Sequence, residues 1–583
     1  MMKPILKIAG LSLLMCAPGA GWAAEEYAVV YENNVQMKTR DGVTLYADIY
    51  RPKAEGKFPV LLERTCYNKY TNVDMGLKAA ARGYVMILQD VRGRYLSGGD
   101  WYPFKYEAND GYDAVEWAAA LPYSNGRVGM IGGSYVGVPV MQAAVSAPPH
   151  LIGISPMITA SDYHAHWAYQ GGAFMQMLAQ AWSSVLAIDV ASRKTMASAA
   201  PPYWDYKRPP SAYPVLDVGT GKGLADYYFD WWSHPAYDDY WKQWSIEEQF
   251  GKVTVPALHF AAWYDLFQDG SIRNYTGIRA HGGSEAARKG QRLIILPGGH
   301  AGFGEKIGEI DFGKVAVFDS WGYTLRFFDH LLKGEDNGFD REKPVKLFVM
   351  GKNVWRDEDE WPISRARATR YYLHSGGRAN SLTGDGNLSP AAPAKELPDQ
   401  YVSDPYRPVP THGGPILGDL GNYPNGPLDQ RRIEERPDVL VYTTPAFEHD
   451  VEVTGPVSLE LYISSSAVDT DFTGKLVDVA PDGRAYNLTD GILRASFRNS
   501  TEKSEPLKPG EVCKVTVDLW STANVFLAGH RLRLEVASAN FPRFDRNPQN
   551  GGRDDGSKAF MTASNMIYHD ADHPSALVLP IVP

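Results

Sequence analysis

The sequence has 583 residues, which is too long for one hydrophobic core and predicts about two to four domains. Its formal net charge is −10, and it contains no long basic run. Nucleic acid is therefore excluded as an expected partner, because phosphate binding needs clustered Lys and Arg.

The first residues have the layout of a secretory signal peptide. Lys3 and Lys7 precede an apolar stretch at 8–16, and small residues follow, with cleavage expected after Ala23. Beyond this segment the sequence has no run of about 18 apolar residues, so no membrane contact is expected after cleavage. The prediction is an exported protein, periplasmic or secreted, with Cys66 and Cys513 left as free thiols.

Short apolar runs alternate with helical patterns along the first part of the mature chain. Strands are expected at 43–52, 58–67, 84–93 and 128–133, and helices at 74–82 and 109–121, the second ending before Pro122. Strands that alternate with helices predict an α/β fold with a largely parallel sheet.

This alternation is interrupted and then resumes. Residues 161–246 are rich in Trp, Tyr, Ala and Met and predict a helical cap inserted into the α/β domain. Strands return at 253–265 and 291–300, and a helix follows near 318–331. The α/β-hydrolase domain is therefore expected to comprise residues 24–160 and 247–350.

The last part of the chain, residues 351–583, has an all-β pattern. From Val457 to Ile463 apolar residues alternate at period two, and Pro481-Asp482-Gly483 has the composition of a hairpin turn. The prediction is an antiparallel β domain, specifically a jelly roll.

The stretch VGMIGGSYVGVPV (128–140) places Ser134 between a buried strand and a helix-like run. That is the context of a nucleophile elbow, although Gly137 lies one position beyond the strict G-x-S-x-G pattern. Pro139 predicts a helix that is loosened or starts late, because its ring would press on the carbonyl of Tyr135. The alternative interpretation is a structural Gly-Ser bend.

A serine nucleophile needs a base and an orienting acid, which in α/β hydrolases follow in the order Ser, acid, His. Asp265 and His300 each end an apolar strand of the resumed sheet, in that order, with Asp269 as a weaker candidate for the acid. The backbone N–H of Tyr135 is the expected first oxyanion donor. From composition alone, Tyr67 in the loop RTCYNKY is more readily interpreted as an ordinary half-buried tyrosine.

Together these residues resemble the cocaine esterase-like serine hydrolases, which are related to X-prolyl dipeptidyl peptidases, α-amino-acid ester hydrolases and glutaryl-cephalosporin acylases. The resemblance runs from about Val35 to the C-terminus. It rests on the order of moderately specific strings, which are MKTRDGVTLYADIYRP, ILQDVRGRYLSGG, GGSYVG, WYDLF, RFFDHLLKG, KLFVMG, SSSAVDTDFTGKLVDVAPDGRA and NVFLAGHRLRLEVASANFPRFDRN.

The resemblance implies roles for individual residues. The family elbow is G-x-S-Y-x-G, which accounts for the displaced Gly137. It implies Ser134, Asp265 and His300 as the catalytic triad. The family also uses a tyrosine hydroxyl from the early loop with the amide after the serine, which implies an oxyanion hole of Tyr67 and Tyr135.

The resemblance also bears on substrate. It implies that the acyl pocket is lined by Trp167, Trp182 and Phe267, for which ordinary packing is the alternative. The α-amino-acid ester hydrolases carry carboxylates at the positions that are Phe267 and Gln268 here. An apolar or aromatic acyl group is therefore expected. Cys66 stands where the nearest relatives usually have proline, and no role is inferred for it.

The sequence thus predicts a serine carboxylesterase that acts on a small-molecule ester without a metal or organic cofactor. The alternatives are an amide-cleaving acylase, an α-amino-acid ester hydrolase or dipeptidyl peptidase, and a carbohydrate-binding protein with an inactive hydrolase domain. The oligomeric state is left open, a homo-oligomer included.

Overall fold

The computed structural model describes residues 27–197, 221–418, 423–555 and 559–583. The expected signal peptide at 1–23 lies outside these residues, as does the proline-rich stretch 201–210 of the cap. Within the described ranges, none of the helices is both long and apolar enough to span a membrane.

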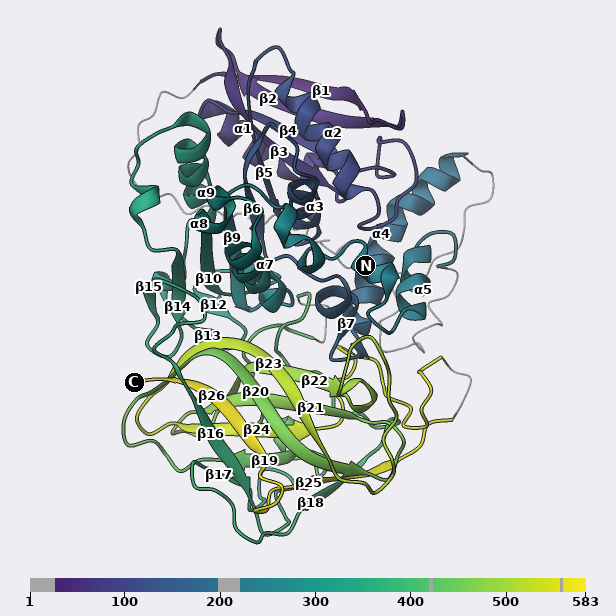
Figure 1. The fold of residues 1–583 in the computed structure, drawn as a ribbon, viewed down its shortest axis with the longest axis vertical. Helices are drawn as coiled ribbons and strands as arrows, with labels where there is room; N and C mark the ends of the chain where they lie inside the picture. Colours follow the sequence, from purple (N-terminus) through teal and green to yellow (C-terminus); the bar gives the residue numbers. More distant parts are fainter. Residues whose placement is uncertain (1–26, 198–220, 419–422, 556–558) are drawn as a thin grey trace, which may run out of the picture.

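An eleven-stranded mixed sheet forms the centre of the α/β domain (Figure 1). Its strand order is β1-β2-β4-β3-β5-β6-β9-β10-β14-β15, with β11 paired to β10. The bounds are β1 Val29–Lys38, β2 Thr44–Pro52, β3 Phe58–Thr65, β4 Val85–Asp90, β5 Ser124–Gly133, β6 Leu151–Met157, β9 Ala257–Tyr264, β10 Gln291–Gly299, β11 Gly302–Phe303, β14 Val345–Val349 and β15 Val354–Glu358. From β4 to β14 the strands run parallel, whereas the edge strands β1, β2 and β15 are antiparallel.

Helices cover both faces of this sheet, which explains why its strands are almost continuously apolar. The helices α2 (Glu107–Ala119) and α3 (Gly137–Ser146) pack on one face, against residues such as Val60 and Val128. On the opposite face lie α1 (Val73–Ala81) and α9 (Ser320–Phe328). The sheet is therefore the buried middle layer of three.

The segment between β6 and β9 is largely helical, as the sequence predicts. Its elements are β7 Tyr169–Gln170, β8 Ala173–Phe174, α4 Gln176–Ala197, α5 Asp226–Ser233 and α6 Asp239–Lys242. The hairpin formed by β7 and β8 was not expected from the sequence, because two-residue strands leave no periodic pattern. These elements lie beside the carboxyl ends of the central strands and enclose the site described below.

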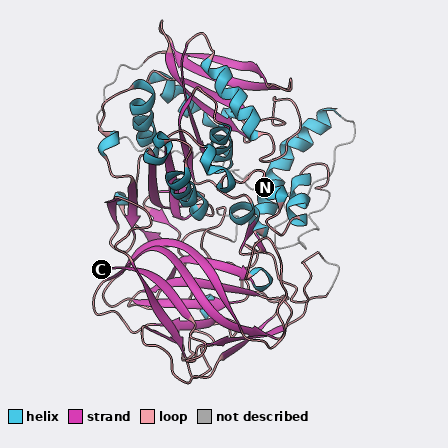
Figure 2. Ribbon diagram, in the orientation of Figure 1, coloured by secondary structure: helices cyan, strands magenta, loops and turns pink. Residues whose placement is uncertain are grey.

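The C-terminal part is an all-β domain, and Figure 2 shows strands and loops making up nearly all of it. Its sheet has the order β18-β25-β20-β26-β16-β17-β19-β24-β21-β22, with β23 paired to β20. The bounds are β16 Arg367–His374, β17 Asn387–Ser389, β18 Asp399–Ser403, β19 Leu440–Thr443, β20 Val451–Ser465, β21 Asp471–Val479, β22 Ala485–Arg494, β23 Cys513–Phe526, β24 Arg531–Ala537, β25 Ala563–Tyr568 and β26 Ala576–Val582. The α/β class with a C-terminal all-β domain is thus confirmed, while the jelly-roll topology stays a prediction.

The sequence patterns of the β domain have direct structural counterparts. Val457, Leu459, Leu461 and Ile463 all lie in the core, on the inward face of β20. Residues 480–484 connect β21 to β22 as an antiparallel hairpin, where Gly483 has a φ of 87° that favours glycine.

Two hydrogen bonds between Gln268 and Ser521 join the α/β domain to the β domain. The side chain of Gln268, at the start of α7 (Gln268–His281), donates to the Ser521 carbonyl at 2.9 Å and accepts from the Ser521 N–H at 3.0 Å. This contact lies three residues after Asp265, so the docked β domain supports the loop that carries that aspartate.

Candidate active site

Ser134 lies on a tight turn between β5 and α3. Its φ is 58°, an uncommon left-handed value for a residue with a side chain. Ser134–Val136 form a 3₁₀ turn, and the α-helix begins only at Gly137, which confirms the predicted late start. This turn points the Ser134 side chain away from the strand, as in a nucleophile elbow.

The glycines around Ser134 allow this turn because side chains would collide there. A Cβ at Gly132 would lie 2.3 Å from the Val136 carbonyl oxygen. A Cβ at Gly137 would lie 2.7 Å from the Cβ of Thr159, just beyond β6. The displaced glycine of the motif therefore lets α3 approach the end of the neighbouring strand.

Ser134, His300 and Asp265 form one hydrogen-bonded chain. The Ser134 hydroxyl lies 2.8 Å from His300 Nε2, and His300 Nδ1 lies 2.6 Å from Asp265 Oδ2. All three side chains are buried. Because the carboxylate can only accept, His300 donates from Nδ1, which leaves Nε2 to accept the serine proton.

The local structure explains how Asp265 and His300 meet. They follow the parallel strands β9 and β10, whose carboxyl ends lie side by side in the sheet. The second oxygen of Asp265 accepts the backbone N–H of Phe267 at 2.7 Å, which fixes the carboxylate. Asp269 lies instead on α7, where it accepts from His166 at 2.9 Å and pairs with Arg273.

Tyr67 is held beside the serine by a tryptophan. The indole N–H of Trp182 donates to the Tyr67 hydroxyl at 2.8 Å, and the phenol lies close enough to Ser134 for the serine to affect its pKa. Burial raises the pKa of the Tyr67 phenol well above its usual value, so the group keeps its proton at neutral pH. Because Trp182 occupies a lone pair of the oxygen, the phenol proton is free to bond another acceptor.

Tyr135, the residue after Ser134, is held in place by hydrogen bonds of its hydroxyl group, which the sequence analysis missed. The Tyr135 hydroxyl donates to Glu107 at 3.2 Å and accepts the Phe104 N–H at 3.0 Å. Glu107 is paired in turn with the fully buried Arg64 at 2.8 Å. This network fixes the ring of Tyr135 and with it the direction of the backbone N–H beside Ser134.

Aromatic rings form the wall next to the triad. Trp167 stacks on Phe267 with ring centroids 4.7 Å apart, and Phe267 meets the His300 ring edge-on at 5.3 Å. The ring centroids of Trp182 and Trp167 lie 5.1 Å apart. The three residues expected to line the acyl pocket therefore lie together, with Phe267 against the His300 ring. Trp101, which the sequence analysis did not single out, extends this wall with a contact to Tyr135 at 5.3 Å.

Two further observations concern the cysteines and Gln268. Cys66 is a buried free thiol and Cys513 is also free. Burial raises the pKa of the Cys66 thiol far above its usual value, so it is not a thiolate nucleophile. The amide of Gln268 is engaged by the backbone of Trp263 and Ser521, so it is not presented to a substrate.

The fold defines the class of protein: an α/β hydrolase with a C-terminal all-β domain. The comparisons with known proteins agree with this class. Residues 41–302 match the X-Pro dipeptidyl-peptidase (S15) family, and residues 337–578 match the X-Pro dipeptidyl-peptidase C-terminal non-catalytic domain.

Similar proteins cover nearly the whole chain. A cocaine esterase from Rhodococcus sp. is 37% identical over 94% of this chain and 98% of its own length. An aminopeptidase from a marine sediment thaumarchaeon has a TM-score of 0.82 at 25% identity, covering 98% of this chain and 99% of that one. An α-amino acid ester hydrolase has a TM-score of 0.77 at 24% identity over the full length of both chains, which shows the shared fold.

With these matches, the chain belongs to the cocaine esterase-like serine hydrolases, within the S15 family. It is an enzyme, a hydrolase of the serine esterase type.

Proposed function

We propose that this protein is an exported carboxylesterase that cleaves esters through an acyl-enzyme on Ser134. The observation that carries the proposal is the buried chain from Ser134 through His300 to Asp265, with contacts of 2.8 and 2.6 Å. A serine with a base at hydrogen-bonding distance, and that base oriented by an acid, is the arrangement that nucleophilic acyl transfer needs.

In the proposed mechanism His300 Nε2 takes the proton of Ser134 as its oxygen attacks the ester carbonyl. Asp265 holds the imidazole in the required tautomer and stabilises the imidazolium. His300 then gives the proton to the leaving alkoxide. A water molecule repeats the sequence on the acyl-enzyme and releases the acid.

The negative oxygen formed in each step would be bound by two donors, the Tyr67 hydroxyl and the Tyr135 backbone N–H. Such donors stabilise the transition state more than the substrate when they are already aimed at the oxyanion. The bond from Trp182 to Tyr67 supports this role, because it orients the phenol before the substrate arrives.

The acyl group would lie against Trp167, Trp182 and Phe267, which favours apolar and aromatic acids. The rings offer apolar faces, and neither Phe267 nor Gln268 supplies a carboxylate to hold a substrate ammonium. This argues against an α-aminoacyl substrate.

Export is part of the proposal and is supported by the sequence of the N-terminus alone. Expression of the full chain, followed by N-terminal sequencing of the protein recovered outside the cytoplasm, tests it. A mature N-terminus at Ala24 is expected, and retention of the intact leader in the cytoplasm would contradict export.

The activity is tested with paired esters and amides that share one acyl group, prepared as benzoyl, short aliphatic, glutaryl and α-aminoacyl sets. The Ser134→Ala variant is the blank. Benzoyl and aliphatic esters should be turned over rapidly, with the amides near the blank. Comparable turnover of glutaryl amides would replace the esterase by an acylase.

A further inference from the structure

Arg94 is a buried arginine between the α/β domain and the helical cap, and the mechanism above does not use it. It follows β4, in the loop 91–99, and is only 1% exposed. Burying a guanidinium is costly unless its donors are bound, so its partners show what the side chain does there.

The guanidinium of Arg94 joins two backbone carbonyls from distant parts of the chain. Its Nε donates to the Cys66 carbonyl at 2.9 Å, and its Nη1 donates to the Leu186 carbonyl of α4 at 2.8 Å. Asp189, three residues further along α4, lies 3.6 Å from Nε and balances the charge. One side chain therefore connects the loop that carries Tyr67 with the cap helix.

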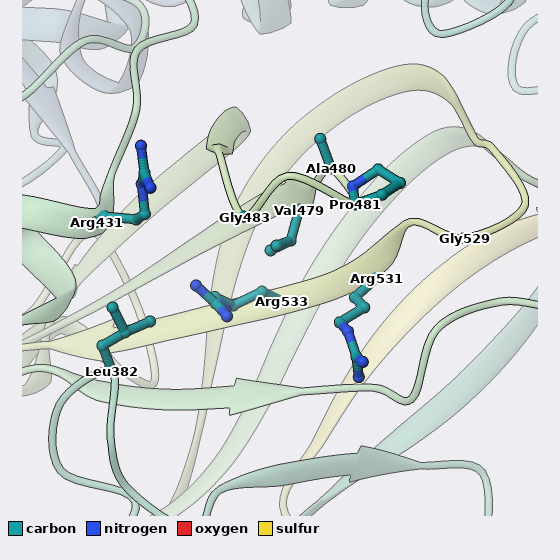
Figure 3. Close-up of a pocket in the computed structure, with 9 residues that line it drawn as sticks. All are labelled: Leu382, Arg431, Val479, Ala480, Pro481, Gly483, Gly529, Arg531 and Arg533. Atoms are coloured by element: carbon teal, nitrogen blue, oxygen red, sulfur yellow. The ribbon is translucent and has the colours of Figure 1, made fainter.

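This use of an arginine differs from that in the hollow of the β domain, which Figure 3 shows. There Arg431 is ion-paired with Asp429, and Arg533 with Glu434. At Arg94 the shorter contacts are to carbonyl oxygens, so its donors fix the positions of two backbone segments.

The first of these segments carries Tyr67. Cys66 and Tyr67 share one peptide unit, and both polar atoms of that unit are bound. Its carbonyl accepts from Arg94, and its N–H donates to Thr65 Oγ1 at 3.0 Å. Because the peptide unit is planar, bonds at its oxygen and its nitrogen fix its orientation and with it the direction in which the Tyr67 side chain leaves the backbone.

The second segment carries Trp182. Leu186 lies four residues after Trp182 on α4, which is about one helical turn. In the same region Asp189 accepts the backbone N–H of Tyr95 at 3.1 Å, a second bond between α4 and the loop 91–99. The helix is thus held just beyond Trp182, whose indole donates to the Tyr67 hydroxyl.

We propose that Arg94 is a positioning residue, which aims the Tyr67 hydroxyl at the oxyanion by fixing the Tyr67 backbone and the helix of Trp182 relative to each other. The proposal rests on the proposed function, because it needs Tyr67 as an oxyanion donor. Such a donor must be aimed before the reaction begins, and a displacement of about 1 Å can cost about 10² in rate. Arginine suits this role, since its rigid planar donors bind both carbonyls in one fixed geometry, which a lysine ammonium on its flexible stem does not.

The test is a double-mutant cycle of Arg94→Lys and Tyr67→Phe, assayed by steady-state hydrolysis of a p-nitrophenyl ester, with thermal unfolding of every variant. Arg94→Lys should lower kcat at least about tenfold with little change in KM, because a misplaced phenol affects mainly the transition state. In the Tyr67→Phe background the same substitution should lower kcat less than about threefold, since no hydroxyl is left to misplace. A merely structural role would give equal losses in both backgrounds, and that result would overturn the proposal.

Arg193→Lys is the matched control. Arg193 also joins α4 to the loop 91–99, but its bonds go to the carbonyls of Ser97, at 2.8 Å, and Gly99, at 3.4 Å, and not to the segment of Tyr67. It should keep wild-type kcat. An equal loss in Arg193→Lys would show that any loosening of α4 has the same effect and would overturn the specific role of Arg94.

A second variant keeps the test decisive if Arg94→Lys does not fold. Asp189→Asn removes the charge that balances Arg94 and keeps an oxygen to accept the Tyr95 N–H. It should lower kcat when Tyr67 is present and leave kcat unchanged in the Tyr67→Phe background. Equal kcat losses in the two backgrounds would again overturn the proposal.

The single variants separate this proposal from the proposed function. A slow Tyr67→Phe enzyme in which the Arg94→Lys loss is undiminished would refute the role of Arg94 alone. Wild-type kcat in Tyr67→Phe would refute the oxyanion role of Tyr67 and the role of Arg94 with it. Ester turnover no faster than the Ser134→Ala blank would overturn the proposed esterase and both of these roles.

Discussion

Replacing Tyr67 by Phe removes one hydroxyl group from the site and leaves the ring in place. The hydroxyl accepts from Trp182 at 2.8 Å and is the proposed donor to the oxyanion, so two interactions change. The developing oxyanion loses a donor, and the indole N–H of Trp182 loses its acceptor. These losses affect catalysis and stability separately, and both can be measured.

The expected magnitudes follow from the two interactions. Loss of one oxyanion donor typically lowers kcat by about 10²–10³, which corresponds to about 3–4 kcal/mol of transition-state stabilisation. A buried N–H left without an acceptor costs about 1–3 kcal/mol of folding stability. KM should change little, because the phenol acts mainly on charge that develops in the transition state.

The assay is the steady-state hydrolysis of a p-nitrophenyl ester, with thermal unfolding of each variant measured alongside. Tyr70→Phe is the matched control: Tyr70 lies three residues away in the same loop and is 48% exposed. It should retain wild-type kcat. If Tyr67→Phe kept kcat within about threefold of wild type, far from the loss expected for an oxyanion donor, Tyr67 would be a packing residue only.

Three further predictions test other parts of the account. Phe267→Ala should lower the ratio of kcat/KM for benzoyl over acetyl esters at least about tenfold, because the stacked wall beside His300 is lost; an unchanged ratio would place the acyl group elsewhere. Glu107→Gln should lower the melting temperature, since Arg64 loses the nearer of its two carboxylate partners, Glu107 and Asp110. It should also reduce kcat as the Tyr135 ring loosens; a fully active variant would exclude a positioning role. Burial raises the pKa of Glu63 from 4.5 to about 7. Between these pH values the folded state holds a proton that the unfolded state has released, so the folded state loses stability as the pH rises from about 4.5 to 7. The stability of Glu63→Gln relative to wild type should therefore increase as the pH rises through that range, and should reach about 3 kcal/mol at pH 8. A stability difference that does not change with pH would contradict the raised pKa of Glu63.

The meeting of Ser134, Asp265 and His300 could be predicted from the sequence because it follows from local patterns. Ser134 stands between an apolar strand and a glycine-bounded helix, and Asp265 and His300 end strands whose apolar runs are unambiguous. Parallel strands bring their carboxyl ends to one edge of the sheet, so residues far apart in the chain meet there.

Other parts of the site could not be predicted, because they depend on contacts that leave no local pattern. Glu107 lies in the first turn of an ordinary amphipathic helix, and nothing in its sequence indicates that it meets the Tyr135 hydroxyl. The bond between Trp182 and Tyr67 joins residues 115 positions apart. The strand β6 was missed since Gly153 and Pro156 interrupt its apolar run.

The central claim is that Ser134 is the nucleophile, activated by His300. Treatment of the folded protein with a fluorophosphonate, followed by peptide mass spectrometry, tests it most directly. The account predicts a single phosphonylated peptide carrying the label on Ser134, with labelling abolished in Ser134→Ala and strongly slowed in His300→Ala. A folded protein that never labels, or a label that persists in Ser134→Ala, would contradict the account.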